Sequence, residues 1–333
     1  MALFTARRDA GGGEASVTAA AATAASVGPV RADTPENQGR SITLQAADGQ
    51  VLAAHWHARL AEPGRGTVVL ASATGVPQSF YLRFAQWLTA QGVDVLRFDF
   101  RGIAASRPAR LRGFVADFSH WTMDLDAALG FALAQGTAPV SLVGHSIGGF
   151  LAPVAPLATR LHRLVLVGAQ SAYWRDFPHP QRWPMAALWH GLLPVVTSLV
   201  GYFPARALRM GEDLPRGVAL QWALRPWRDP FDIEQFSTGY ARALPPVHLV
   251  AANDDPFATP AALARVASRL TAAPPRTHLI AAGTEGPKRI GHFGLFRSAC
   301  GEQVWPRLLE LALPRVALIG GAGPRSASIH RAS

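Results

Sequence analysis

The strongest chemical signal in the chain is a serine set between glycines, directly after an apolar run. The residues Gly144-His145-Ser146-Ile147-Gly148-Gly149 follow a predicted strand at Val140 to Val143 and precede a helix-like stretch. On such a sharp strand-to-helix turn, a serine has strained backbone and its hydroxyl projects above the sheet. Side chains two positions before and after would collide, so Gly144 and Gly148 are required there. The pattern predicts that Ser146 is a nucleophile.

A serine hydroxyl needs a base, and the base needs a carboxylate that holds it in the right tautomer. The chain order typical of this pattern is serine, then an acid, then histidine. His292 fits that order because it lies in a loop after the last predicted strand, Thr277 to Ile280. The other downstream histidines do not occupy that loop: His162, His179, His190, His248 and His278. We therefore predict that His292 is the general base.

Two adjacent carboxylates compete for the role of the acid. Asp254 and Asp255 both follow the predicted strand Val247 to Ala251. Neighbouring residues in extended backbone point in different directions, so only one of them can reach the histidine. Pro256 restricts Asp255 to extended backbone, which limits how its carboxylate is presented. A shift of one residue in strand register would exchange the two.

Strands and helices alternate along most of the chain, which predicts an α/β fold with a mostly parallel sheet covered by helices on both faces. The predicted strands are Ser41 to Leu44, Val51 to His57, Thr67 to Ala71, Val93 to Phe98, Val140 to Val143, Leu164 to Val167, Val247 to Ala251 and Thr277 to Ile280. The predicted helices are Phe80 to Gln91, Trp121 to Gln135, Pro260 to Leu270 and Trp305 to Leu313. Pro153 and Pro156 predict that the helix after the serine is short or kinked.

Residues 171–242 interrupt this alternation. This segment is rich in proline and holds five of the nine tryptophans, Trp174, Trp183, Trp189, Trp222 and Trp227. We expect it to be a helical cap over the carboxyl edge of the sheet, where open α/β sheets bind ligands. Trp183 and Trp189 are its predicted substrate-binding residues. The predicted organisation is then a disordered tail at 1–39, a core at 40–170 and 243–314, the cap at 171–242, and a flexible tail at 315–333.

Composition gives little support for a membrane span or a nucleic-acid partner. No stretch reaches the roughly 18 uninterrupted apolar residues of a span, and Leu192 to Phe203 contains Pro194 and Gly201. We expect that segment to pack on the core, with contact at a membrane surface as the alternative. The net charge is +10, but only one basic residue is lysine and the arginines are scattered. Without a basic run or a known motif, we expect no nucleic-acid partner.

Cofactor, metal and compartment signals are equally sparse. The single cysteine, Cys300, excludes an intrachain disulfide. His55 and His57 share one face of a strand, but two histidines without a third ligand do not predict a metal site. No apolar core of a signal peptide follows Arg7 and Arg8, so we expect a cytoplasmic protein, with a poorly formed export signal in the Ala-rich stretch Ser16 to Val30 as the alternative. We also expect no cofactor.

These motifs resemble the α/β-hydrolase superfamily over residues 41–314. The resemblance rests on Asp99-Phe100-Arg101-Gly102, Gly144 to Gly149, Asp255-Pro256 and Gly291-His292-Phe293. With Ala71-Ser72-Ala73-Thr74-Gly75-Val76-Pro77 and Arg289 to Gly294, the chain is similar to uncharacterised predicted bacterial hydrolases that look like serine aminopeptidases and monoacylglycerol lipases.

The resemblance adds roles that the residue pattern leaves open. It implies that the aspartate before the proline, Asp255, is the acid, and that Asp254 is a turn residue that accepts local backbone N–H groups. It implies an oxyanion hole made by the backbone N–H groups of Ile147 and Thr74. Ser72-Ala73 replaces the usual His-Gly, which makes Thr74 the matching position for the second donor.

The expected function is hydrolysis of an ester or related acyl bond in a small, largely apolar substrate through an acyl-enzyme. One alternative is an amidase or aminopeptidase acting on small peptides, which would need an acidic cap residue for the free amino group. The candidates are Glu212, Asp213, Asp229 and Asp232. The other alternative is a binding protein that has the fold without catalysis. Substrate identity and oligomeric state cannot be read from the fold.

Overall fold

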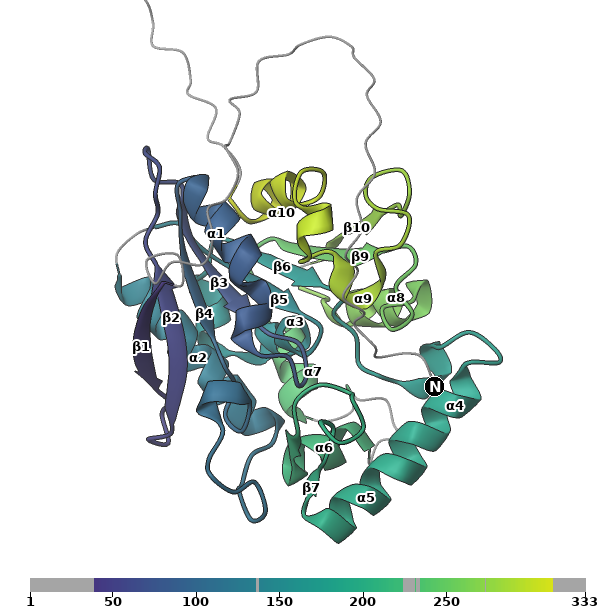
Figure 1. The fold of residues 1–333 in the computed structure, drawn as a ribbon. Coiled ribbons are helices and arrows are strands. Elements are labelled where there is room, and N and C mark those ends of the chain that lie inside the picture. The colour runs from purple at the N-terminus through teal and green to yellow at the C-terminus, as the bar shows by residue number, and fades with distance from the viewer. Residues whose placement is uncertain (1–38, 136–137, 224–230, 232–233, 273, 314–333) are drawn as a thin grey trace, which may run out of the picture.

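The computed structural model describes residues 39–135, 138–223, 231, 234–272 and 274–313 (Figure 1). The tails predicted at 1–39 and 315–333 lie outside these residues, apart from Gly39, and so do Trp227, Asp229 and Asp232. The description below concerns the described residues only.

An eight-stranded sheet forms the centre of the molecule. Its order is β1-β2-β4-β3-β5-β6-β9-β10, in which β1 and β2 pair antiparallel, β2 and β4 pair antiparallel, and all other neighbours are parallel. The strands are β1 (Arg40–Gln45), β2 (Val51–His57), β3 (Gly66–Ala71), β4 (Val93–Phe98), β5 (Val140–His145), β6 (Leu164–Val167), β9 (Val247–Ala252) and β10 (Arg276–Ile280). Every predicted strand is present, with ends that differ by no more than two residues. The predicted mostly parallel sheet is therefore confirmed.

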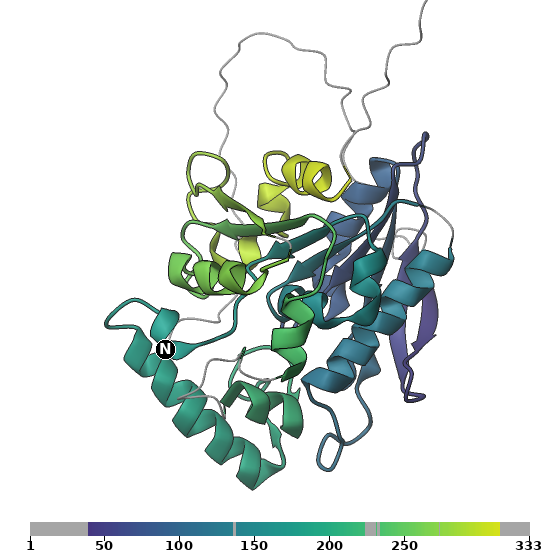
Figure 2. The ribbon, with the colours of Figure 1, turned by 180° about the vertical axis from the view of Figure 1, so that it is seen from behind.

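Helices cover both faces of this sheet (Figures 1 and 2). One face carries α1 (Leu82–Ala90) and α10 (Trp305–Ala312), and the other carries α2 (Phe118–Ala134), α3 (Ile147–Leu151) and α8 (Pro260–Arg269). The central strands are buried throughout because alternate residues enter the two cores. Val68, Val95 and Val143 belong to the core under α1, whereas Val69, Leu96 and Leu142 belong to the core under α2.

Local sequence explains where the helices begin and end. The Asp117 side chain caps α2 by accepting the His120 N–H at 3.0 Å, and Thr259 caps α8 in the same way. The helix after Ser146 is short, as Pro153 predicts. It ends at Leu151 and continues as two 3₁₀ turns that each carry a proline near their start.

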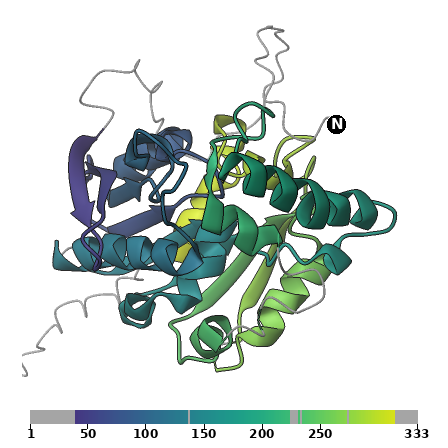
Figure 3. The ribbon, with the colours of Figure 1, turned by 90° about the horizontal axis from the view of Figure 1, so that it is seen from below.

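A helical insertion lies between β6 and β9, which are neighbours in the sheet. It contains α4 (Arg182–Ala187), α5 (Leu193–Val200), α6 (Arg216–Ala223) and α7 (Glu234–Tyr240), with a small ribbon of β7 (Tyr202–Phe203) and β8 (Leu214–Pro215). Figures 1 and 3 show α4 and α5 as one long helix at the outer edge of the molecule. A π-turn, Leu188–Leu192, joins the two.

This long helix corrects two expectations from the sequence. Arg182–Val200 is long and apolar enough to cross a membrane by length and composition, and no other helix of the described residues is. The sequence analysis considered only Leu192 to Phe203 and took Pro194 as a break, whereas the helix begins at Arg182 and runs through both Pro184 and Pro194. Each lies within the first turn of its own helical segment, where proline is tolerated. Only 17% of its most apolar 18-residue window is buried, so most of it does not pack on the core.

A buried ion pair joins the first three strands of the sheet to α2. The Arg101 guanidinium, in the loop after β4, donates to Asp124 of α2 at 2.7 Å and to Asp48 of the β1–β2 turn at 3.0 Å. Asp124 also accepts the Arg101 backbone N–H at 2.9 Å. Burial raises the pKa of Asp124 to about 6, so this carboxylate is ionised at neutral pH.

Asp124→Asn should be strongly destabilising, because the buried Arg101 charge would then be paired only with Asp48, which is partly exposed. Breaking a buried pair costs about 3–5 kcal/mol, whereas Asp48→Asn should cost about 1 kcal/mol because that carboxylate lies near solvent. Urea unfolding of both variants measures the difference. Equal losses would show that the buried partner has no special role.

Candidate active site

Ser146 lies at the tip of the turn between β5 and α3, with left-handed backbone (φ 52°, ψ −113°). Its own N–H donates to Val167 of the neighbouring strand at 2.8 Å, which fixes the turn against the sheet. A Cβ atom at Gly144 would lie 2.6 Å from the Gly149 nitrogen, and one at Gly148 would lie 2.5 Å from the Ala71 carbonyl oxygen. Backbone therefore fills the space where side chains at 144 and 148 would have to be.

His292 and Asp255 form a buried hydrogen-bonded pair beside this turn. The distance from His292 Nδ1 to Asp255 Oδ2 is 2.8 Å. The second carboxylate oxygen accepts the backbone N–H groups of Phe257 at 2.8 Å and Ala258 at 3.0 Å. Burial alone would raise the pKa of Asp255, but the His292 charge, the ring hydrogen bond and the two N–H donors together lower it. Asp255 is thus a fixed anion that accepts the Nδ1 proton.

Asp254 has a different set of partners. Its carboxylate accepts the backbone N–H groups of Ile290 at 2.9 Å and Gly291 at 2.8 Å. These are the two residues before His292, and they lie 36 and 37 positions further along the chain. The sequence predicted that Asp254 accepts local N–H groups; instead it holds the histidine loop. The adjacent aspartates therefore position the same histidine, one through its ring and the other through its backbone.

A glycine that the sequence analysis missed packs against this pair. Gly168 ends β6 in left-handed backbone (φ 59°), and its N–H donates to Val250 at 2.7 Å. A Cβ atom there would lie 3.1 Å from His292 Cε1 and 3.3 Å from Asp255 Oδ2. The absent side chain leaves room for the imidazole ring and the carboxylate. Its position directly after a predicted strand, beside β5, is the one signal that could have found it.

His145 connects the three loops around the serine. Its Nε2 lies 2.9 Å from the His292 carbonyl oxygen, which can only accept, so Nε2 carries the proton. Nδ1 must then accept from the Tyr81 hydroxyl at 2.7 Å, and the Tyr81 oxygen in turn accepts the Ala73 backbone N–H at 2.9 Å. Burial, followed by the His292 charge, lowers the pKa of His145 to about 3, which keeps this ring neutral.

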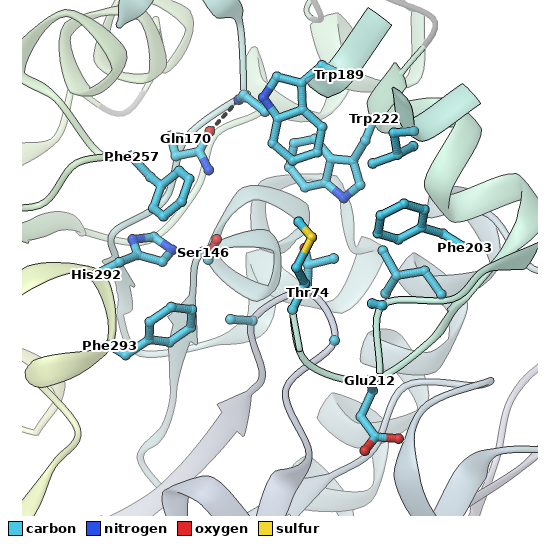
Figure 4. Close-up of a pocket in the computed structure, with 17 residues that line it drawn as sticks. Thr74, Ser146, Gln170, Trp189, Phe203, Glu212, Trp222, Phe257, His292 and Phe293 are labelled. Atoms are coloured by element: carbon cyan, nitrogen blue, oxygen red, sulfur yellow. Dashed lines mark hydrogen bonds between the residues drawn. The ribbon is translucent and has the colours of Figure 1, made fainter. Parts of the chain in front are cut away.

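Ser146 and His292 face a common cavity of about 670 Å³, measured with its open mouth (Figure 4). The His292 ring and the Ser146 hydroxyl point toward one another across its edge, although no hydrogen bond joins them. Such contacts are often long without substrate. Thr74 also lines the cavity, whereas Ile147 is fully buried at the start of α3.

The insertion supplies most of the apolar wall of this cavity. Trp189, one of the two predicted substrate-binding residues, lines it and stacks on Trp222 with ring centroids 5.8 Å apart. Trp183 does not: it is 57% exposed and packs on Trp174 outside the cavity. The sequence missed Phe203, Leu214 and Trp222 as lining residues because pocket and core aromatics look alike in sequence.

Three polar hydrogens in this apolar wall lack an acceptor. The indole nitrogens of Trp189 and Trp222 and the hydroxyl of Thr74 are buried, and no described residue hydrogen-bonds to them. A buried donor without a partner costs about 1–3 kcal/mol.

The described residues contain no group of three or more His, Cys, Asp or Glu side chains arranged to hold a metal ion. The two strand histidines have other partners. His57 accepts from the buried Arg97 guanidinium at 2.7 Å, and His55 contacts Gln78 at 3.1 Å.

Part of the chain matches a known protein family. Residues 62–209 match a family model described as "Serine aminopeptidase, S33", a span that contains Ser146 but neither Asp255 nor His292. No curated protein matches the chain.

Solved structures with the same fold are many, and all those compared here are distant in sequence. A soluble variant of monoglyceride lipase from Saccharomyces cerevisiae, in complex with a substrate analogue, has a TM-score of 0.59 at 18% identity, covering 81% of this chain and 94% of its own. A putative hydrolase from Agrobacterium vitis has 0.54 at 18%, covering 82% and 98%. A thermophilic esterase from Thermogutta terrifontis has 0.53 at 16%, covering 82% and 97%. With this sheet order and the glycine-flanked serine after β5, the chain has the α/β-hydrolase fold.

Proposed function

We propose that this protein is a serine hydrolase that cleaves an ester or related acyl bond of a small, largely apolar substrate. The observation that carries the proposal is the convergence of Ser146, His292 and Asp255 at the edge of one apolar cavity. A nucleophile, a base and a group that orients the base are the components of acyl transfer through a covalent intermediate.

The hydrogen bonds fix the direction of proton transfer. The Nδ1–H group of His292 donates a hydrogen bond to the Asp255 carboxylate, so the Nε2 lone pair is available to the Ser146 hydroxyl. As Nε2 takes that proton, the serine oxygen bonds to the acyl carbon and forms a tetrahedral oxyanion. The oxyanion collapses, the alcohol leaves with the proton from Nε2, and the acyl group stays on Ser146. Water then repeats the two steps and releases the acid.

We assign stabilisation of the oxyanion to the backbone N–H groups of Ile147 and Thr74. Ile147 N is the first nitrogen of α3 and has no acceptor within its helix. Thr74 follows Ala73, whose own N–H is already taken by Tyr81. Each preorganised donor of this kind is worth about 2.7–4 kcal/mol in the transition state.

The charges near the cavity favour an ester over a peptide with a free amino terminus. Glu212 lines the cavity but is paired with Arg206, and Figure 4 shows its carboxylate pointing away from Ser146. Asp213 is paired with Arg107 at 2.8 Å. Among the described lining residues, no other carboxylate is present to bind an ammonium group. In this proposal, residues 171–242 act as a cap that selects substrates with apolar groups. The cytoplasmic location of the protein stays a prediction.

Ser146→Ala should abolish hydrolysis of acyl esters and labelling by a fluorophosphonate, because it removes the atom that forms the covalent bond. Loss of the nucleophile costs on the order of a million-fold in turnover. Ser171→Ala is the matched control, since it removes another buried serine hydroxyl that has no partner. If a Ser146→Ala protein with a normal melting temperature were still labelled, Ser146 would not be the nucleophile.

Asp255→Asn should lower turnover by about ten-thousand-fold, because an amide favours the wrong tautomer of His292. Asp254→Asn should cost at most about a hundred-fold, through slight misplacement of the histidine loop. Turnover of one ester by both variants decides between them. The reverse order of effects would assign the acid to Asp254.

Tyr81→Phe should lower turnover and slow fluorophosphonate labelling while leaving KM nearly unchanged, because it disconnects His145 from the Ala73 loop. It should also destabilise the fold by about 1–3 kcal/mol through the buried groups left unpaired. Tyr240→Phe is the control, since its buried hydroxyl donates to Phe150 at 2.8 Å away from the serine loops. If the role of Tyr81 were purely structural, Tyr81→Phe and Tyr240→Phe would have equal turnover when they are compared at equal stability.

A further inference from the structure

The solvent side of the long helix Arg182–Val200 is largely apolar, with Ser198 as an exposed polar residue. Between positions 183 and 200 the sequence has no aspartate, glutamate, lysine or arginine. Four of the ten large hydrophobic side chains exposed in the described residues lie on this helix: Trp183, Leu192, Val195 and Leu199. We call these four residues the outer apolar face. Apolar side chains gathered on one exposed element often mark a site of contact with a partner or a membrane.

The opposite side of the helix is already occupied by the protein. Met185, Leu193 and Thr197 are buried, and Leu193 lines the cavity together with Trp189. The helix therefore has one side on the protein body and one side toward solvent, at the outer edge of the molecule (Figure 3). A helix held along its length in this way can lie on a membrane but cannot cross one.

Arginines stand at both ends of the outer apolar face. Arg175 and Arg182 precede or begin the helix. At the other end, Arg112 donates to the carbonyl oxygens of Val200 at 2.9 Å and Leu199 at 3.4 Å, and the exposed Arg110 lies two residues before it.

The acidic residues of this region do not neutralise those arginines, because each acidic residue forms an ion pair with a different arginine. Asp176 is paired with Arg265, Asp213 with Arg107, and Glu212 with Arg206. The ends of the helix therefore carry positive charge, and the face between them carries none.

We propose that the outer apolar face docks on a membrane surface that contains anionic lipids. Leu192, Val195 and Leu199 enter the boundary between headgroups and acyl chains, while the arginines at each end bind lipid phosphates. A second copy of this chain fits less well, because symmetric pairing would bring two sets of arginines together.

Docking there also specifies the substrate class, and this part rests on the proposed function. The same helix would contact lipid with one side and line the cavity with the other. An ester lipid with a modest apolar chain, leaving the membrane beside Trp189 and Leu193, is the substrate that this arrangement favours.

Vesicle co-sedimentation of the full chain tests the docking without relying on hydrolysis. The probes are phosphatidylcholine vesicles with and without phosphatidylglycerol. We expect binding to the anionic vesicles, weakened by about 1 M salt, at which the Debye length falls to about 3 Å. Leu199→Glu should weaken this binding about tenfold or more, because it puts a charge where lipid is expected.

Leu60→Glu is a closely matched control: Leu60 is 75% exposed and Leu199 76%, and Leu60 lies in the loop between β2 and β3, at the amino end of β3. It should bind vesicles like the natural chain, and Ser146→Ala should as well. Leu199→Glu should keep its turnover on a water-soluble short-chain ester.

Equal vesicle binding by Leu199→Glu and Leu60→Glu, or none by the natural chain, would overturn the docking proposal. So would a dimer in analytical ultracentrifugation that Leu199→Glu dissociates. Vesicle binding without any ester hydrolysis would instead contradict the proposed function and leave the docking surface standing.

Discussion

The hydrogen bond from His145 to the carbonyl oxygen of His292 is the constraint on which the site depends. A carbonyl can only accept, so this one contact fixes the tautomer of a buried ring and then the direction of every bond beyond it, through Tyr81 to Ala73. The three loops that carry the serine, the base and the proposed oxyanion donor are thereby joined below the cavity floor. Because the His145 ring stays neutral, the connection does not change when His292 gains or loses a proton. The proton that passes between Ser146 and His292 can therefore move without any change in the hydrogen bonds that join His145, Tyr81 and Ala73.

A second constraint is close backbone contact at the carboxyl edge of the sheet. The turn after β5 touches the end of β3 at Ala71, and the end of β6 touches the ring of His292. Both contacts exist because parallel strands finish at the same edge, so residues far apart in sequence meet there. Glycine stands at both contacts, Gly148 and Gly168, because a side chain at either position would meet the neighbouring chain.

Much of this arrangement could be predicted from the sequence, because the signals are local. Eight apolar runs of strand length predicted eight strands, and Gly144 to Gly149 predicted the turn that carries the serine. The role of Asp254 and the packing of Gly168 against His292 could not be predicted, since both depend on contacts with a loop more than 30 residues away. The long helix was missed for another reason: proline was counted as a break at positions where a helical segment tolerates it. Trp183 was misplaced because the tryptophan density of a segment does not say which of its tryptophans face the cavity.

The backbone of Ser146 has a further consequence. A residue with a side chain rarely adopts its dihedral angles, and such a conformation costs about 1–3 kcal/mol. Glycine would adopt it without that cost. The natural chain is therefore less stable at this one position than a simple substitution would make it, in a trade of stability for activity. Selection for thermal stability alone would replace the serine with glycine and leave a sturdier, inert protein.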